Sequence, residues 1–107
     1  MRGQQKRKHK INKINKKNML YRLYIGANND THHVEEDKLK EVLNKYYEGY
    51  TIIKSTGYWQ GTKEDSRIIE IDTTNRDQVL QAIQELKAVL QQEAIGLIEI
   101  DQSMQFI

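Results

Sequence analysis

The chain has 107 residues, which is enough for one domain with a modest core. Its 37% hydrophobic and 30% charged residues make a rather polar composition that is still compatible with a globular fold. The absence of cysteine excludes disulfides and thiolate metal sites. No segment approaches the ~20 apolar residues of a membrane span, and the basic N-terminus lacks the apolar core of a secretion signal. We therefore expect a cytoplasmic protein without a membrane partner.

Charge is distributed very unevenly along the chain. Residues 1–18 carry eight Lys or Arg and no acid, whereas the other 89 residues hold nine basic and fifteen acidic groups, a net charge of −6. In the first segment only Ile11 and Ile14 are sizeable apolar residues after Met1, too few to offset the entropy lost on ordering. The sequence predicts a flexible basic arm over 1–18 and a single α+β domain over 19–107.

The basic arm has three alternative interpretations. It could contact nucleic acid, because each neutralised phosphate releases counterions. It could also be a dispensable tail, or translation could start at Met19, where the regular pattern begins. The nucleic-acid hypothesis assigns phosphate contacts to Lys6, Arg7, Lys8, Lys10, Lys13, Lys16 and Lys17.

A strand and a helix are predicted after the arm. Apolar residues alternate over 19–25, which is typical of a strand, and Gly26 follows them. After a polar loop, helical spacing relates Leu39, Val42, Leu43 and Tyr46. Val34 is placed for a hydrophobic staple around an N-cap at Glu35. We expect Gly49 to end this helix by adopting a positive φ.

The second half of the chain predicts a hairpin, a helix and a last strand. Residues 50–60 and 66–74 are rich in β-branched and aromatic residues, and 61–65 should turn the chain between them. Asn75 and Gln78 form a potential capping box before a helix. The 3.6-residue period of that helix relates Val79, Leu80, Ile83, Leu86, Lys87 and Leu90. Residues 94–101 predict the fourth strand, which 102–107 would extend or flank with an edge strand.

The predicted order is β-α-β-β-α-β, the split βαβ arrangement. Right-handed crossovers place both helices on one face of a four-stranded antiparallel sheet. The fold class is therefore α+β, ferredoxin-like, with one sheet face left open. This fold carries many unrelated functions, so it does not by itself identify one.

The segment 57–61 concentrates unusual residues. It holds the single tryptophan, Trp59, between Gly57 and Gly61 and next to Tyr58. Adjacent strand residues point to opposite faces, so one aromatic faces the helices and the other faces the open side. An exposed aromatic between glycines is typical of an association surface or a ligand platform. The structural alternative is a cross-strand packing pair with Ile68 or Ile69.

These considerations give a set of candidate ligand or interface residues and no catalytic ones. Glu64, Ser66 and Tyr58 could serve a small enzyme, but acids in a turn are usually solvated and Ser66 has no adjacent histidine. His32 and His33 match no zinc spacing, so we predict neither a metal nor a cofactor. The candidate residues are Tyr24, Tyr58, Trp59, Gln60, Glu64 and Ser66.

The pattern G-x-W-x-G-x-x-E-x-S runs from Gly57 to Ser66, after a helix that ends in Tyr-x-Gly-Tyr. In this feature the chain resembles small uncharacterised proteins of bacteria and phages, in which an aromatic-bearing second strand precedes an acid and a hydroxyl. The resemblance covers roughly residues 20–100 in layout and implies a ferredoxin-like fold in an accessory protein of a phage or mobile element. It implies no particular activity.

Self-association is the function that the open face favours. Tyr24 shares its strand face with Leu20 and Arg22, which makes that face amphipathic. The outward positions expected to form one patch are Leu20, Tyr24 and Thr56, with Tyr58 or Trp59. Small domains of this kind commonly bury such a face in an isologous contact. We therefore predict a non-enzymatic binding and assembly module, a homo-oligomer with a small-molecule or protein ligand.

Overall fold

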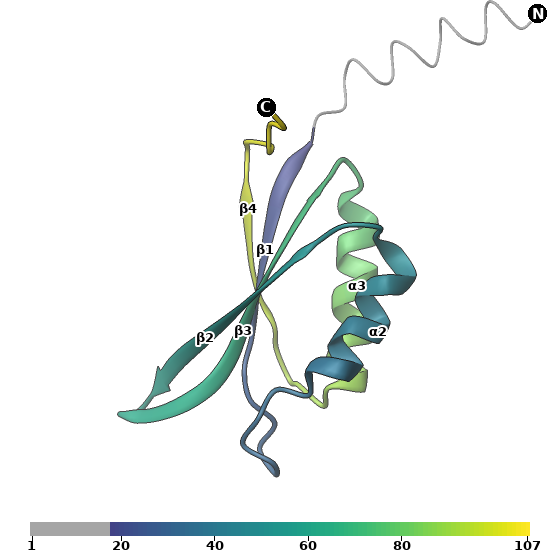
Figure 1. The fold of residues 1–107 in the computed structure, drawn as a ribbon. Coiled ribbons are helices and arrows are strands. Elements are labelled where there is room, and N and C mark those ends of the chain that lie inside the picture. Colours follow the sequence, from purple (N-terminus) through teal and green to yellow (C-terminus); the bar gives the residue numbers. More distant parts are fainter. Residues whose placement is uncertain (1–17) are drawn as a thin grey trace, which may run out of the picture.

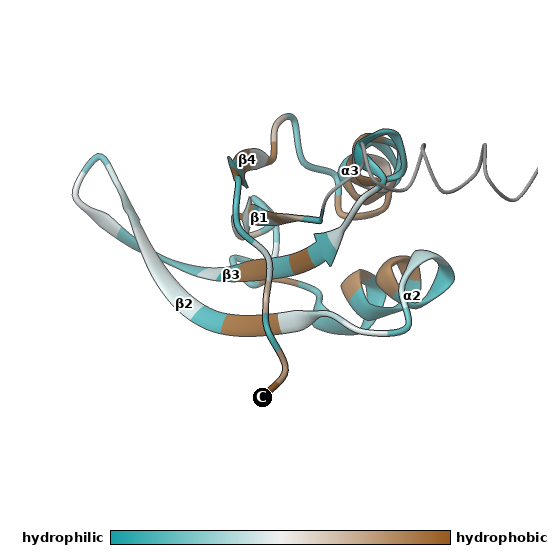
Figure 2. Ribbon diagram, turned by 90° about the horizontal axis from the view of Figure 1, so that it is seen from above, coloured by the Kyte–Doolittle hydropathy of each residue, from teal (hydrophilic) through white to brown (hydrophobic). Residues whose placement is uncertain are grey.

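A computed structural model describes residues 18–107 of the chain. Its elements follow the predicted order and are β1 (Met19–Ile25), α2 (Glu36–Tyr46), β2 (Thr51–Trp59), β3 (Thr62–Thr73), α3 (Arg76–Val89) and β4 (Gly96–Ile100) (Figure 1). The strands form one antiparallel sheet in the order β2-β3-β1-β4. Figure 2 shows both helices on one side of it. The ferredoxin-like α+β fold predicted from the sequence is confirmed.

The core lies between the sheet and the two helices. Alternate residues of β1 (Tyr21, Leu23 and Ile25) face the helices and are buried, as the period-2 pattern predicted. Their partners in β3 include Ile69 and Ile71, which are also buried. The helices contribute their predicted apolar stripes, and the buried members are Leu39, Val42, Leu43, Val79, Ile83, Leu86 and, just after α3, Leu90.

The end of α2 differs from the prediction for Gly49. The helix ends at Tyr46, and Tyr47 takes an extended backbone conformation (φ −134°, ψ 136°) while its N–H donates to the Leu43 carbonyl at 2.9 Å. Gly49 is not among the described residues with positive φ. Any residue type can adopt an extended backbone conformation, so this helix end needs no glycine. Glu35 is the N-cap as predicted, without a side-chain capping bond.

The start of α3 confirms half of the predicted capping box. The Asn75 side chain accepts the backbone N–H of Gln78 at 3.0 Å. The Asn75 N–H donates to the Thr73 hydroxyl at 3.2 Å, and not to the Gln78 side chain as a full capping box requires. The Thr73 hydroxyl, two residues before Asn75, therefore accepts the N–H that the glutamine side chain was expected to accept.

The turn between β2 and β3 is shorter than predicted. It contains only Gln60 (φ 50°) and Gly61 (φ 79°), and β3 begins at Thr62. Two positive φ values are the mark of a type I′ turn, whose twist matches that of the flanking strands. Glu64 and Asp65 consequently lie in a strand, not in a solvated turn.

Residues 101–107 neither extend β4 nor add an edge strand, which corrects the prediction for this segment. They form an irregular tail, in which the Met104 N–H donates to Oδ2 of Asp72 at 2.5 Å. Among the helices of residues 18–107, none has the length and apolar character needed to cross a membrane.

Candidate functional site

The β2–β3 register assigns each aromatic of the hairpin to one face. Trp59 pairs with Thr62 and Tyr58 with Lys63, so neither forms the cross-strand pair with Ile68 or Ile69. Alternation places Trp59 on the open face and Tyr58 on the helix side. Both are well exposed, at 64% and 71%, because the hairpin extends beyond the helices (Figure 1).

This register corrects the composition of the expected patch. Thr56 and Tyr58 lie on the helix side of β2, whereas Leu20, Tyr24 and Trp59 lie on the open face. Thr56 pairs with Asp65, which belongs to the same side as the buried Arg67. The alternation was visible in the sequence, but the face could be assigned only once the register was known.

A notch forms where β1 ends while the hairpin continues. The β1–β3 pairing stops at Ile25 and Arg67, so β3 residues 62–66 have no β1 partner. A cavity of about 250 Å³ lies there. Its lining includes five of the six candidate residues, namely Tyr24, Tyr58, Trp59, Glu64 and Ser66. The lining of the notch thus includes residues of both sheet faces.

The sixth candidate, Gln60, lies on the other side of the tryptophan. It lines a cavity of about 300 Å³ together with Trp59, Lys63 and Glu64 and with the loop after β1, including His32. Trp59 and Glu64 therefore border both cavities. The arrangement offers an exposed indole with a carboxylate beside it, which suits a flat ligand with a polar donor.

The polar groups of the notch favour binding over nucleophilic catalysis. Ser66 Oγ lies 2.7 Å from Ser55 Oγ, and either hydroxyl can donate. An attacking serine needs a neighbouring base that takes its proton, and a second serine cannot do this. Gly57 lies beside the pair, with room for a Cβ at 3.8 Å from Ser66 Oγ. Its lack of a side chain keeps this part of the notch open.

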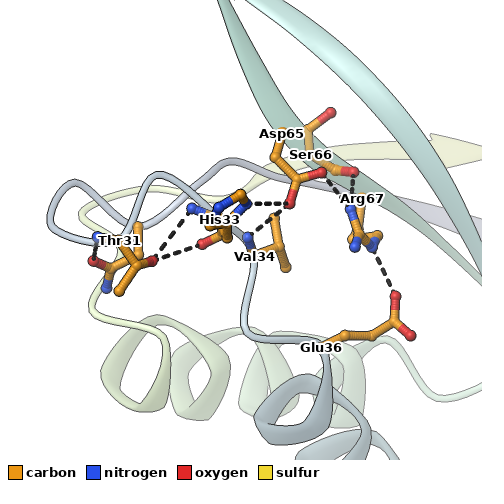
Figure 3. Close-up of polar contacts among 8 residues, drawn as sticks. Thr31, His33, Val34, Glu36, Asp65, Ser66 and Arg67 are labelled. Atoms are coloured by element: carbon orange, nitrogen blue, oxygen red, sulfur yellow. Dashed lines mark hydrogen bonds and ion pairs between the residues drawn. The ribbon is translucent and has the colours of Figure 1, made fainter.

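Sequence reasoning missed an ionic cluster around the buried Arg67, beside the notch. Arg67 is 8% exposed and donates to Glu36 Oε1 and to Asp65 Oδ1, both at 2.7 Å, and to the Ser66 carbonyl at 2.8 Å (Figure 3). Asp65 also accepts the backbone N–H of Val34 at 3.0 Å. The available signal was the alternation itself, which places Arg67 in line with Ile69 and Ile71 and so requires partners for its charge.

The cluster shifts the acidity of its carboxyl groups. The Val34 N–H, followed by the Arg67 guanidinium, lowers the pKa of Asp65. The hydrogen bond from Arg67 lowers the pKa of Glu36. Both carboxylates are thus held in the charged form that neutralises Arg67.

The two histidines lie in the loop beside this cluster. His32 adopts a positive φ of 64°, and His33 Nδ1 lies 3.9 Å from Asp65 Oδ2 with 77% of its side chain exposed. Across residues 18–107, no group of three or more His, Asp or Glu side chains is arranged to hold a metal ion. The seven candidate nucleic-acid contacts, Lys6 to Lys17, lie outside the described residues.

The fold and the notch define a small ferredoxin-like α+β protein with an aromatic cleft at its hairpin. No protein-family model and no curated protein matches the chain. Among solved structures, the chain is similar to a DUF3240 family protein from Shewanella baltica, with 15% identity, a TM-score of 0.58, and coverage of 84% of this chain and 94% of that one.

Proteins described as divalent ion tolerance proteins CutA1 have a similar structure. The one from Ehrlichia chaffeensis is 21% identical, with a TM-score of 0.53 and coverage of 86% of this chain and 87% of its own. CutA1 from Oryza sativa is 12% identical, with a TM-score of 0.51 and coverage of 85% and 84%. At these identities the likeness shows the shared fold alone.

Proposed function

We propose that this protein is a non-enzymatic assembly and binding module that associates with further copies of itself through the open sheet face. One observation carries the proposal. Ile53, Ile68 and Tyr24 stand directly opposite one another on β2, β3 and β1, and they form a continuous apolar row on the face that no helix covers. Ile53 is 40% and Tyr24 41% exposed. Exposed apolar rows of this kind are typical of protein interfaces.

The fourth strand extends this surface. Gly96 of β4 pairs with Tyr24, and a Cβ at Gly96 would lie 3.3 Å from the Tyr24 Cβ and 3.7 Å from its ring. Because Gly96 has no side chain, the Tyr24 ring can lie close to the backbone of β4. Ile98, 44% exposed, and Ile100 continue the apolar surface along β4.

The charges on the open face support contact between identical copies. In the row next to Ile68 and Tyr24, Arg22 donates to Glu70 Oε2 through Nε at 2.9 Å and Nη2 at 2.7 Å. A two-fold axis beside this pair would bring Arg22 of one copy towards Glu70 of the next. Opposite charges that are adjacent on one surface make it complementary to itself. The notch then remains accessible at the rim as the ligand site.

Sedimentation of two charge variants tests the assembly. Wild type should sediment at a multiple of the 12.7 kDa chain mass. Ile53→Lys should shift it to the monomer, because a charge in the apolar row would have to be desolvated. Gln84→Lys adds the same charge on the exposed side of α3 and should leave the mass unchanged. A wild type that stays monomeric at high micromolar concentration would contradict the proposal.

Nucleic-acid association through the basic arm is the second candidate. The observation that favours it is the charge division between eight bases in residues 1–18 and a net charge of −6 in the remainder. About five phosphate contacts would give log K a slope near −4.5 against log salt. Replacing Lys6, Arg7, Lys8 and Lys10 with glutamine should flatten that slope by roughly 3–4. An unchanged slope would exclude the arm as the binding element.

A further inference from the structure

A third cavity lies at the end of the open face that is remote from the hairpin turn. Its volume is about 470 Å³, within the range of small-molecule sites. It is bounded by the starts of β1 and β2, the end of β3 and the C-terminal tail. In Figure 2 the tail leaves β4 and passes over the end of the sheet towards β2. The tail thus supplies one wall of this tail cavity.

Most of the wall is apolar or aromatic. Leu20 and Tyr50 contribute from the sheet side, and Met104 and Phe106 from the tail. Phe106 is 90% and Met104 49% exposed. A ligand with an apolar body would cover these side chains, and the two aromatic rings could also attract a cationic group.

The charged part of the wall is acidic. Glu70 and Asp72 line the cavity, and its lining among residues 18–107 includes no Lys, Arg or His. Arg22 compensates Glu70 through its two bonds to Oε2. Among residues 18–107 no cation is paired with Asp72: Oδ2 accepts the Met104 N–H, and Oδ1 is buried without a hydrogen-bond partner. A buried acceptor without a donor is unfavourable, and a bound donor would relieve it.

We infer that the tail cavity binds a small organic ammonium compound with an apolar body. The ammonium group donates to the Asp72 carboxylate after a small displacement of the tail, and the apolar body lies between Leu20, Tyr50 and Phe106. An anion of the same shape is rejected, because it would meet two carboxylates in a partly desolvated space. The site is separate from the notch and does not depend on self-association.

Three phenyl compounds of similar shape and different charge test this inference with the full chain. They are 2-phenylethylammonium, 2-phenylethanol and 3-phenylpropionate, each titrated while protein NMR shifts are followed. We expect saturable binding of the ammonium compound, weaker binding of the alcohol and none of the carboxylate. The perturbed resonances should belong to Leu20, Tyr50, Asp72 and the tail.

Asp72→Asn removes the charge and retains an oxygen that can accept the Met104 N–H. It should weaken binding of the ammonium probe roughly tenfold or more, the usual effect of losing a charged hydrogen-bond partner. Glu41→Gln makes the same chemical change on the exposed face of α2 and should leave the affinity unaltered. Phe106→Ala, at an exposed position that does not endanger the fold, should also weaken binding.

Several results would overturn the inference. They are equal affinity for the ammonium and carboxylate probes, wild-type affinity in Asp72→Asn, or perturbations confined to the hairpin. If Asp72→Asn fails to fold, Phe106→Ala decides, and unchanged affinity in that variant rejects the site. Because assembly is measured separately by sedimentation, a monomeric protein that binds the ammonium probe would reject the assembly proposal and retain this one.

Discussion

Asp65 accepts the backbone N–H of Val34 at 3.0 Å, and this bond ties the segment before α2 to the β2–β3 hairpin (Figure 3). The same carboxylate accepts from Arg67 at 2.7 Å through its other oxygen. Together with the Arg67–Glu36 bond, the Asp65 side chain therefore holds the hairpin against the start of α2 and so contributes to the shape of the notch.

Asp65→Ala should destabilise the protein by about 1–3 kcal/mol, because it leaves the Val34 N–H and a buried guanidinium short of an acceptor. Amide exchange at Val34 should accelerate. Asp65→Asn retains an acceptor and should cost less. Glu64→Ala, at the exposed neighbouring position, should stay within about 0.5 kcal/mol of wild type. Equal losses in the free energy of unfolding for Asp65→Ala and Glu64→Ala, measured with urea, would show that the Val34–Asp65 bond does not stabilise the fold.

The lowered pKa values of Asp65 and Glu36 predict a stability that depends on pH in the acid range. A carboxyl group whose folded pKa lies below its unfolded value stabilises the fold fully above the unfolded value. That contribution is lost as the pH falls through the folded value. The free energy of unfolding should therefore decline below about pH 4.5, near the ordinary pKa of these groups.

Urea unfolding between pH 7 and pH 3 measures this decline. Asp65→Asn removes one of the two titrating groups of the Arg67 cluster and should give a shallower pH dependence than wild type, whatever its stability at neutral pH. A parallel pH profile for the two proteins would show that the Asp65 carboxyl does not contribute to acid sensitivity.

Trp59 should be dispensable for folding. At 64% exposure its side chain has little packing to lose, so Trp59→Ala should change the free energy of unfolding by less than about 1 kcal/mol. Leu39→Ala, at a fully buried position, should cost about 2–5 kcal/mol and serves as the comparison. Any change in ligand binding or assembly in Trp59→Ala would then be due to the lost surface side chain and not to unfolding. A large drop in melting temperature for Trp59→Ala with an unchanged oligomer mass would disprove this view of the residue.

Two glycines should respond in opposite ways to the same substitution. Gly61 has a φ of 79° in the hairpin turn, so Gly61→Ala should cost about 1–2 kcal/mol. Gly49 lies outside the positive-φ region, and a Cβ added to it would have no atom within 4 Å. Gly49→Ala should be neutral or slightly stabilising, because it restricts the unfolded chain. Thermal melts of both variants test this prediction. A drop in melting temperature for Gly49→Ala as large as that for Gly61→Ala would contradict it.

Periodic features of the chain were predictable from sequence, and features set by register or by distant contacts were not. The spacing of Leu39, Leu43, Val79 and Leu86 indicated both helices and their buried faces, and alternation in β1 indicated its inward residues. Local patterns of this kind report directly on which side of an element is buried. They also sufficed for the order of elements and hence for the fold.

The prediction that Tyr58 and Trp59 face opposite sides was correct, but which one faces the helices depends on a turn of two residues, not five. The bond between Asp65 and Val34 joins positions 31 residues apart, and no local pattern encodes it. The candidate residues were chosen because they are chemically unusual, and five of the six line one notch. The notch that brings them together follows from where β1 ends, which only the pairing defines.

The order of the strands also affects the order in which the strand pairs form during folding. Trp59 and Thr62 pair across a two-residue turn, so the β2–β3 hairpin can form early and locally. Leu20 pairs with Ile100, 80 positions further along the chain, and closing so long a loop costs more entropy. The β1–β4 pairing should therefore be the late step in folding, and until it forms β1 presents an unsatisfied backbone edge to other chains.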